Sequence, residues 1–573
     1  MPKIAILPDL LINKIAAGEI IERPASVVRE LIDNSIDAGA EKITVEALHG
    51  GKKLIKVSDD GAGMSREDAL LCLERHATSK IRSDDDLFNI STLGFRGEAL
   101  PSIASISKLT LITSAVNSSA GTKIEINGGK EKNITDAPAY AGTAVEVRDI
   151  FYNIPARRKF LKTIPTELSH IIDTVIQKAF PCFETAFTLK HNNSDIINVH
   201  AVKGLKERFI QLYGEELSGE FLEVKKDAGH MKLYGFLSSL DFTRAGKSYQ
   251  YIFVNRRAVK NPTVNHAVYA AYSGLIPKDR HPAFFLFLDI DPQRVDVNVH
   301  PAKREVRFET PEEIHRLVES AVYDALRGGA VSGTQDKGVS NASMPGFTYP
   351  KPSGSGFYNP SVVQEQHAKD FQPGFFAEEA FARHKYFHIG ECFIAAIADN
   401  RLIVIDQHAA HERVLYEKYL KKTAIETENL FLPVRVELPP REFNIIMNHK
   451  GLLNDFGLVV EEFGGHDVII KTIPRELRKA DLKGLLLDIA SGIIEEEGTG
   501  AKGAPEKDRL THGIAARLAC HKSVRGSEPL NEMELSKLLS DLDKTESPDK
   551  CPHGRPTRIF FPLDELRKMF KRK

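Results

Sequence analysis

The segment "SVVRELIDNSIDAGA" (residues 26–40) decides the fold of the N-terminal half of this chain. Its apolar residues Val28, Leu31 and Ile32 recur at helical spacing and predict an amphipathic helix. Gly39 suits the left-handed position just past the end of a helix, so we expect the helix to stop there.

Short apolar segments elsewhere in the chain predict strands that alternate with helices. In the N-terminal half these are "KITVEAL" (42–48), "LIKVSDDG" (54–61), "FVNRRAVKN" (253–261) and "RVDVNVHPAKREVRF" (294–308). The segment "ECFIAAIADNRLIVID" (391–406) contains two apolar runs joined by Asp-Asn, which predicts an antiparallel pair. The fold class that follows is a multidomain α/β protein.

Polar residues occupy the other face of the first helix. Glu30, Asn34 and Asp37 fall at i, i+4 and i+7, so they share that face. A solvated helix face would explain them equally well in an isolated helix. Asn, however, is a poor residue for a helix interior. Its place one turn after a Glu favours a functional pair: a carboxylate that orients water, and an amide oxygen that binds Mg²⁺.

Glycine-rich segments follow the helix without forming a Walker site. "DDGAGM" (59–64) lacks the third glycine of a dinucleotide fingerprint, and no GxxxxGK[ST] occurs in the chain. "RHATSKI" (75–81) and "GFRGEAL" (94–100) come next, and the second places glycines on both sides of Arg96 before residues compatible with a helix. Such a loop can direct backbone N–H groups onto phosphates. "GTAVEVRDIFYNIPARRKFLK" begins at Gly142.

The order of these motifs resembles the ATP-binding fold shared by gyrase B, Hsp90, histidine kinases and MutL (the GHKL superfamily). "IAAGEIIERPASVVRELIDNSIDAGA" (15–40), "GFRGEAL" and "FYNIPARRKFL" (151–161) resemble the MutL family of mismatch-repair proteins in particular. The resemblance covers nearly all of residues 1–327. It implies that ATP closes two N-terminal halves into a dimer that can encircle DNA.

The resemblance also implies roles for individual residues. Glu30 would be the general base that activates water, and Asn34 would bind Mg²⁺. Asp59 would accept a hydrogen bond from the adenine amino group, with Gly61, Gly63 and Thr143 at the same end of the nucleotide. The residues implied at the phosphates and the lid are Thr78, Ser79, Lys80, Gly94, Arg96 and Gly97. Lys303 would reach the γ-phosphate from the second domain, although a surface lysine at a strand turn is the alternative.

Four regions follow along the chain. We expect a GHKL-type α/β sandwich ATPase domain at 1–205 and an S5-like α/β transducer domain, which supplies Lys303, at 206–327. Residues 328–384 are rich in Gly, Ser, Pro and Asn and lack periodic apolar spacing, so we expect a flexible, disordered linker. Residues 385–573 would form an α/β C-terminal dimerisation and endonuclease domain, with an external lobe at about 437–505.

Two basic clusters are candidate DNA contacts. They are "PARRKFLK", with Arg157, Arg158, Lys159 and Lys162, and "NRRAVK", with Arg256, Arg257 and Lys260. Ordinary surface charge is the alternative for either cluster alone. Taken together, in domains that close around a duplex, they favour contacts to phosphates that do not depend on base sequence. The net charge of −1 means that local patches of this kind would have to bind the DNA.

"DQHAAHERVLYE" (406–417) is the candidate metal segment of the C-terminal part. Asp406 could simply cap the helix that follows the strand "RLIVI", whereas His408 and Glu412 share one helical face. "RLACHKSVR" supplies Cys520, and "CPHGRP" supplies Cys551 and His553, which on an extended chain would face the same way. Core cysteine is the alternative for each thiol. Carboxylate, imidazole and thiolate together suit Zn²⁺ or Mn²⁺.

The same segment resembles the DQHA-x-x-E-x-x-x-x-E pattern of MutL proteins that nick DNA, and "CPHGRP" belongs to the same branch. The resemblance implies that Asp406, His408, Glu412, Cys520, Cys551 and His553 are metal ligands, with the first three catalytic. Glu417 is expected to support the helix. The function expected is a metal-dependent endonuclease regulated by ATP. The alternative is an ATP-driven matchmaker clamp with a structural metal, and a sensor kinase or chaperone fits poorly.

The remaining expectations concern partners and compartment. Five scattered cysteines without a CxxC pair fit a reducing cytosol, and no stretch is apolar enough to span a membrane, so we expect a cytoplasmic, nucleoid-associated protein. The resemblance implies a homodimer, double-stranded DNA, a MutS-like mismatch recognition protein and the replication sliding clamp. The clamp segment would be "ENLFLP" (428–433), where Glu428 replaces the usual Gln and, when ionised, cannot donate a hydrogen bond.

Overall fold

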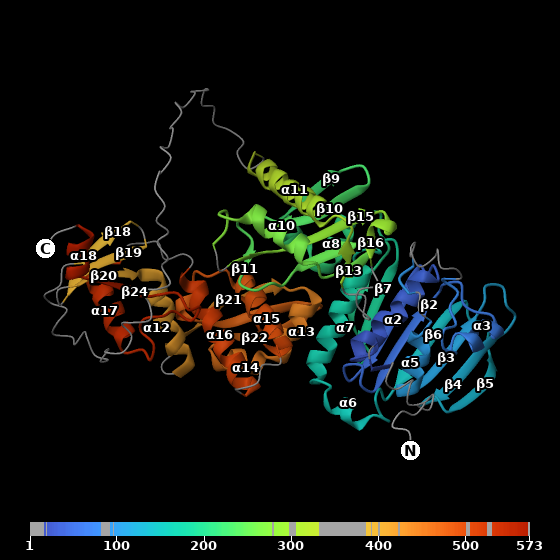
Figure 1. Cartoon of the computed structure of the whole chain (residues 1–573). Helices are drawn as coiled ribbons and strands as arrows, with labels where there is room; N and C mark the ends of the chain where they lie inside the picture. The colour runs from blue at the N-terminus through green and yellow to red at the C-terminus, as the bar shows by residue number, and fades with distance from the viewer. Residues whose placement is uncertain are drawn as a thin grey trace, which may run out of the picture.

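Figure 1 shows the computed structural model of the chain, with the N-terminal half and the C-terminal half side by side. No described helix is long and apolar enough to cross a membrane. The described residues are 17–18, 20–81, 92–94, 97–277, 280–296, 305–331, 386–390, 392–398, 401–421, 425–499, 505–523 and 530–570.

The ATPase domain is a layer of helices packed on one mixed sheet. Eight strands follow the order β5-β4-β3-β6-β2-β1-β7-β8, with β1 and β7 parallel. The strands are β1 (Lys42–Leu48), β2 (Leu54–Asp59), β3 (Lys108–Ser114), β4 (Gly121–Asn127), β5 (Glu131–Ala137), β6 (Gly142–Arg148), β7 (Ala186–His191) and β8 (Ser194–Val199). The helices are α2 (Pro24–Asp37), α3 (Arg66–Leu71), α5 (Ala99–Ile106), α6 (Pro155–Lys159) and α7 (Ile164–Ala179). Helices α8 (Leu205–Tyr213) and α9 (Glu215–Gly219) follow, at the start of the predicted transducer region.

Helix α2 forms as its periodicity predicts. Val28, Leu31 and Ile32 are buried in the core, and α2 packs against α7. Gly39, with φ of +72°, follows the helix as expected. Burying this apolar face between the sheet and α7 fixes the position of the polar face, which carries Glu30 and Asn34.

The transducer domain is a second sheet, in the order β13-β12-β15-β10-β9, with helices α10 and α11 packed together. Helix α11 runs to Val331, four residues past the predicted domain boundary at 327. The strand predicted at 294–308 is described only as two short pieces, since residues 297–304 lie outside the described part. The elements are β9 (Phe221–Asp227), β10 (Met231–Ser238), β11 (Thr243–Arg244), β12 (Gln250–Val254), β13 (Arg257–Val259), β14 (His281–Pro282), β15 (Phe284–Ile290), β16 (Val295–Asp296), β17 (Arg307–Phe308), α10 (Pro262–Tyr272) and α11 (Pro311–Val331).

An aromatic cluster joins the transducer sheet to the ATPase domain. Phe285 of β15 is fully buried, with its ring centroid 5.2 Å from Phe180, 5.1 Å from Phe209 and 5.0 Å from Tyr213. Phe180 follows α7, and the other two belong to α8. These rings belong to the same buried cluster as the α2 core, so the two N-terminal domains share one hydrophobic core.

The C-terminal part contains a small sheet and an external lobe. The predicted pair at 391–406 is confirmed as antiparallel β19 and β20, in a sheet ordered β18-β19-β20-β24. This part comprises β18 (Tyr386–Ile389), β19 (Phe393–Ala398), β20 (Arg401–Asp406), β24 (Arg558–Pro562), α12 (Gln407–Lys421), α16 (Glu506–Ser523), α17 (Glu532–Asp543) and α18 (Leu563–Met569). The external lobe, residues 427–499, starts about ten residues before its predicted limit and comprises β21 (Thr427–Glu437), β22 (Val459–Gly464), β23 (Asp467–Pro474), α13 (Pro440–Asn448), α14 (Lys450–Asp455) and α15 (Leu482–Thr499).

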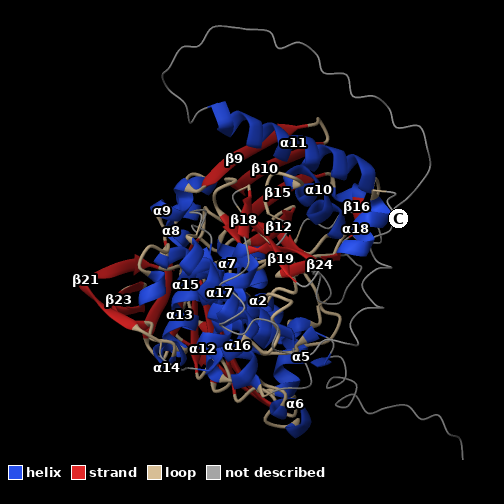
Figure 2. Ribbon diagram, turned by 90° about the vertical axis from the view of Figure 1, so that its left-hand side faces the viewer, coloured by secondary structure: helices blue, strands red, loops and turns tan. Residues whose placement is uncertain are grey.

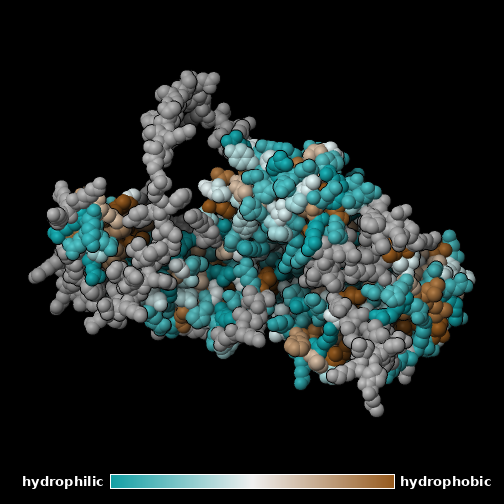
Figure 3. All heavy atoms as spheres, viewed as in Figure 1, coloured by the Kyte–Doolittle hydropathy of each residue, from teal (hydrophilic) through white to brown (hydrophobic). Residues whose placement is uncertain are grey.

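The C-terminal sheet is apolar on both faces. Ile394, Ala396, Ile403 and Ile405 are buried against α12 and α17. The opposite face exposes Phe387, Ile389, Phe393, Ile397 and Ile559. Apolar patches interrupt the hydrophilic surface of the molecule, including one on this C-terminal part at the left of Figure 3. An exposed apolar sheet face of this kind marks a surface for association with another chain.

Phe285→Ala should destabilise the N-terminal half by about 3–5 kcal/mol, because it removes a ring from the centre of the shared core. The measurement is the urea midpoint of unfolding, followed by near-ultraviolet circular dichroism. Phe160→Ala is the matched control, since Phe160 is 83% exposed and should leave the midpoint unchanged. Equal midpoints for the two variants would show that the two domains do not share a core.

Candidate functional site

The carboxylate of Asp59, at the end of β2, organises one end of the predicted nucleotide pocket. It accepts hydrogen bonds from the Ser35 hydroxyl (2.7 Å) and from the backbone N–H groups of Gly61 (3.1 Å) and Thr143 (3.2 Å). The side chain is 6% exposed. Because a carboxylate has about four lone-pair positions, one remains for a donor such as an exocyclic amine.

Close backbone approach explains the glycines beside Asp59. Gly63 has a φ of +65°, and a Cβ there would lie 2.0 Å from the Ser114 carbonyl oxygen. Gly142 has a φ of +113°, and a Cβ there would lie 2.0 Å from the Asp59 carbonyl oxygen. The Thr113 hydroxyl lies 2.9 Å from that of Thr143 and accepts from the Met64 N–H. Ser35 and Thr113 were missed by the sequence reasoning, since a hydroxyl at these positions gives no spacing signal.

The other end of the pocket is built around Asp37. Its carboxylate accepts from the N–H groups of Leu93 (2.8 Å) and Gly94 (2.9 Å) and forms an ion pair with Lys80. The Lys80 ammonium also lies 3.0 Å from Oδ1 of Asn34. The amide oxygen expected to bind Mg²⁺ therefore faces a cation in this structure. The helical spacing predicted that Asp37 lies on the polar face of the helix, but no role was predicted for it from the sequence.

The other predicted nucleotide residues have the following positions. Glu30 is buried, and the Arg29 guanidinium lies 3.2 Å from its carboxylate. The Thr78 hydroxyl accepts from the Lys80 N–H at 3.2 Å, which turns the chain at Ser79. Gly97 has a φ of +63° and lies close to the Ala77 carbonyl. Arg96 and Lys303 lie outside the described residues.

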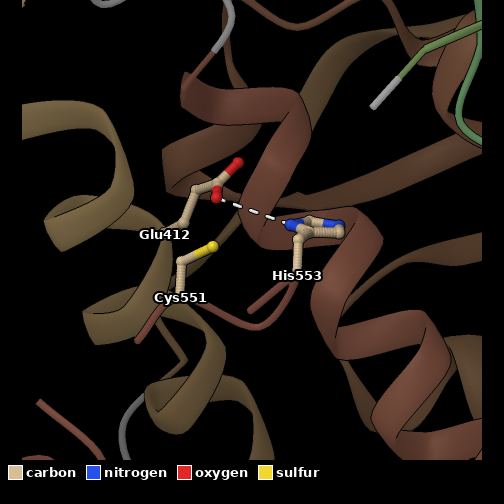
Figure 4. A group of neighbouring side chains, drawn as sticks. All are labelled: Glu412, Cys551 and His553. Atoms are coloured by element: carbon tan, nitrogen blue, oxygen red, sulfur yellow. Dashed lines mark ion pairs between the residues drawn. The ribbon is translucent and has the colours of Figure 1, made fainter. Parts of the chain in front are cut away.

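Three ligand atoms converge in the C-terminal part, from Glu412, Cys551 and His553 (Figure 4). These atoms all lie within 4.8 Å of one another, and the Glu412 and Cys551 side chains are buried. Glu412 lies on α12, 139 residues before Cys551, so folding joins two of the three predicted segments. Carboxylate oxygen, thiol sulfur and imidazole nitrogen form a donor set that fits a first-row transition metal.

The route by which Cys551 and His553 converge differs from the prediction. The segment is a tight turn rather than an extended strand: the Gly554 N–H donates to the Cys551 carbonyl, and Gly554 has a φ of +84°. The turn brings the i and i+2 side chains to the same side, as alternation along a strand would have done.

Histidines surround the Glu412 carboxylate on both sides. His408 Nε2 lies 3.3 Å from one oxygen and His553 Nδ1 lies 3.5 Å from the other. Burial raises the pKa of Glu412, but the hydrogen bonds from His408 and His553 outweigh that effect and hold it well below its usual range. Hydrogen bonds with Cys551 and with Glu412 raise the pKa of His553 to about 9 against the effect of its burial. The side chains of His408, Glu412 and His553 therefore favour a positive charge beside the Glu412 carboxylate.

Among the described residues, the other predicted metal ligands do not belong to the group of three converging atoms. Asp406 caps α12 by accepting from the Ala409 N–H at 3.0 Å. Cys520 is buried on α16, which packs along α12. Glu417 accepts from the Glu546 N–H at 2.8 Å, and this contact anchors the helix, as predicted for a supporting residue.

Three of the seven predicted DNA contacts have partners within the chain: Arg157 and Arg257 donate to backbone carbonyl groups, and the exposed Arg256 lies 3.4 Å from the Glu184 carboxylate. The Arg257 guanidinium is buried and donates to the Thr92 carbonyl oxygen, and its burial lowers its pKa. The Arg157 guanidinium lies against Gly18 and donates to the Ile21 carbonyl at 3.2 Å. Neither Arg157 nor Arg257 offers a free guanidinium to a phosphate in this structure. The exposed members are Arg158, Lys159, Lys162, Arg256 and Lys260.

Three family models match the chain. Residues 21–150 match the "Histidine kinase-, DNA gyrase B-, and HSP90-like ATPase". Residues 209–327 match the "DNA mismatch repair protein, C-terminal domain" and 387–530 the "MutL C terminal dimerisation domain". The chain is 38% identical, over 575 residues and 100% of both chains, to the DNA mismatch repair protein MutL of Thermodesulfovibrio yellowstonii. The chain belongs to the MutL family of DNA mismatch repair proteins.

A second relative is similar over the whole chain, and a solved structure is similar over about half of it. MutL of Geobacter sulfurreducens is 38% identical, covering 100% of this chain and 99% of that one. A solved structure of the Aquifex aeolicus MutL ATPase domain complexed with ADP is 26% identical, covering 52% of this chain and 98% of that one, with a TM-score of 0.38. The predicted GHKL ATPase fold and the C-terminal dimerisation domain are thereby confirmed for this MutL-family chain.

Gly63→Ala should weaken ATP binding at least about tenfold, because an added Cβ collides with the Ser114 carbonyl and the residue must keep a left-handed φ. The measurement is a titration with a fluorescent ATP analogue. Gly39→Ala is the matched control: it shares a positive φ, but its Cβ meets nothing within 4 Å. Equal weakening by both variants would show that backbone strain, and not close approach at Gly63, determines the affinity.

Proposed function

We propose that this MutL-family protein is an ATP-regulated, metal-dependent endonuclease that nicks one strand of DNA during mismatch repair. The observation that carries the nuclease is the convergence of Glu412, Cys551 and His553 from two remote segments. A buried thiol and a buried carboxylate beside a histidine form an unusual group for a purely structural core, since burying a charged group is costly even when it is paired. Both segments carry the motifs that resemble the nicking branch of the family.

In the ATPase domain, Glu30 polarises the attacking water and Asn34 holds Mg²⁺ at the phosphates. Asp59 positions the adenine, and Asp37 holds the backbone of residues 93–94 beside Lys80. Lys303, which lies outside the described residues, would contact the γ-phosphate, so that loss of this phosphate on hydrolysis would free the transducer. This is how ATP turnover would change the arrangement of domains around DNA.

In the C-terminal part, Glu412, Cys551 and His553 would hold Zn²⁺ or Mn²⁺, and Asp406, His408 and Cys520 would be the further ligands that the family resemblance implies. The bound metal supplies Lewis acidity, which lowers the pKa of water and offsets charge on the phosphate. His408 orients the Glu412 carboxylate from the side opposite His553. Asp406 positions the first turn of α12 through its cap.

Partners follow from surfaces and from the family. The exposed apolar face of β18-β19-β20-β24 pairs two chains into a homodimer, in agreement with the matched dimerisation domain. Arg158, Lys159, Lys162, Arg256 and Lys260 contact phosphates of double-stranded DNA. A MutS-like protein recognises the mismatch.

The sliding clamp is a further partner through "ENLFLP". In Figure 2, β21 and β23 project from the side of the molecule. Pairing of β21 with β23 is interrupted between Asn429 and Val434, where Phe431 is 98% exposed. Glu428 lies 3.7 Å from Arg478, so its carboxylate has a partner within the chain. The apolar residues, and not Glu428, would make the contact with the clamp.

The second candidate function is a matchmaker clamp whose C-terminal metal is structural. It is favoured by Asp406, because one oxygen of its carboxylate is already used to cap α12. In that case the three converging ligands would only fix the turn at Cys551 against α12.

Glu30→Ala should lower the ATP hydrolysis rate about 100-fold or more and leave ATP binding intact, since only the base is removed. The rate is measured as phosphate release, and binding with the same fluorescent analogue. Glu22→Ala, at a position before α2, is the control and should hydrolyse normally. Full hydrolysis by Glu30→Ala would refute its role as the base.

Wild-type protein with Mn²⁺ should relax supercoiled plasmid. Glu412→Gln and His553→Ala should reduce nicking at least about 100-fold and lower the bound metal measured by mass spectrometry. Asp406→Asn removes the carboxylate charge but keeps the helix cap, because Asn also caps helices, so this variant tests the carboxylate alone. His512→Ala is the control, since His512 contacts Tyr416 outside the group. Metal bound by wild type without any relaxation would favour the matchmaker clamp.

A further inference from the structure

The external lobe lies against both N-terminal domains rather than apart from them (Figure 1). Helix α13 packs beside α7 of the ATPase domain, and α15 faces β11 and its surroundings in the transducer. Residues 332–385, which connect the two halves in sequence, number 54 and span about 180 Å when fully extended. The chain between the halves therefore does not by itself force this contact.

At the transducer, the contact is centred on Asp488 of α15. Its carboxylate lies 3.2 Å from the Arg244 guanidinium and 3.3 Å from that of Arg280. Asp488 and Arg244 are 1% and 2% exposed, so these charges have no access to water in this arrangement. Beside them, the hydroxyls of Ser248 and Ser491 lie 2.7 Å apart.

At the ATPase domain, the charges are arranged in the opposite sense. Here the lobe supplies Arg441, whose guanidinium lies 3.2 Å from the carboxylate of Asp173 on α7. The Tyr251 hydroxyl donates to the same carboxylate at 2.7 Å. A lobe that presents an acid at one end and a base at the other can pair with this surface in one orientation only.

The physical balance of such a contact favours reversible docking. Buried ion pairs gain about as much from their attraction as they lose on desolvation, so they specify an orientation more than they add stability. Separation of the halves would break the pairs Asp173–Arg441 and Asp488–Arg244, whereas the contacts of Asp173 with Tyr251 and of Asp488 with His521 lie within one half and would remain. Because the halves belong to one chain, the docked arrangement forms at an effective concentration set by the connecting residues and needs little intrinsic affinity.

We propose that the external lobe is an intramolecular docking element for the N-terminal half of its own chain, and that the docked lobe restrains the ATPase helices. Asp173 lies on α7, which also forms the ion pair between Lys178 and Asp33 of α2. Helix α2 carries Glu30 and Asn34. A lobe held on α7 thus acts on the helix of the proposed catalytic base, and this part of the inference rests on the proposed ATPase function.

A disulfide tests the docked arrangement. Ser248→Cys with Ser491→Cys, in a background with the exposed Cys392→Ser, should form an intrachain disulfide on mild oxidation with glutathione, because the native hydroxyls are in contact. Non-reducing electrophoresis should show a monomer of altered mobility, and each single cysteine variant should show none. Absence of the crosslink would overturn docking. A covalent dimer would overturn docking within one chain.

Charge reversal tests whether the ion pairs specify the contact. Arg441→Asp should slow crosslinking several-fold, because it places a second carboxylate against Asp173, and adding Asp173→Arg should restore the rate. Arg475→Asp is the matched control, since Arg475 is an exposed lobe residue whose guanidinium lies 3.0 Å from the carboxylate of Glu426, directly before the lobe, and away from the N-terminal half. Failure of the double reversal to restore the rate would overturn the role of this pair.

Turnover tests the restraint. The crosslinked protein should hydrolyse ATP several-fold more slowly than the same protein after reduction, because a cycle that passes through a second conformation is blocked. Equal rates would overturn the restraint. Lack of hydrolysis by wild type would instead count against the proposed function, and the crosslink would still report docking.

Discussion

Helix α2 must bury both of its faces, and the rest of the N-terminal half depends on how it does so. One face is apolar and lies in the core. The other carries ionisable groups that are removed from bulk water, so each requires a partner. Glu30 pairs with Arg29, Asp33 with Lys178 of α7, and Asp37 with Lys80 and the backbone at residues 93–94. These partners determine where α7 and the phosphate end of the pocket lie.

Local patterns of the sequence predicted the elements well and the partners poorly. Periodic spacing predicted α2, and two apolar runs joined by Asp-Asn predicted the pair β19–β20, because burial of apolar side chains determines each of them. The backbone partners of Arg157 and Arg257 were not predictable, since a basic cluster has the same sequence whether its side chains face solvent or donate to carbonyl groups of the chain. The docking of the external lobe could not be predicted from the sequence either, because the ion pair Arg441–Asp173 joins residues that are 268 positions apart.

Helix α12 has a position in the C-terminal part comparable to that of α2. Leu415 and Tyr419 belong to the core shared with the external lobe, whereas Ala410 belongs to the core under the C-terminal sheet. Glu412 lies between them in sequence, where the two cores meet. Helix α12, which carries candidate metal ligands, therefore packs against the external lobe and against the C-terminal sheet. The sequence showed only an ion-rich helix start here, since its apolar residues divide between two cores.

Two buried carboxylates, Asp59 and Glu412, show how partners and not residue type determine chemistry. Asp59 is held by a hydroxyl and two backbone N–H groups, none of which titrates near neutral pH or can be displaced without unfolding the loop. Such a carboxylate is rigid and suits recognition of a neutral amine. Glu412 is held by His408 and His553, beside the Cys551 thiol, and each of these can lose a proton and turn its lone pair toward a metal. The first arrangement favours selection of a ligand, and the second favours exchange of protons for a cation, which is the property that a catalytic metal site requires.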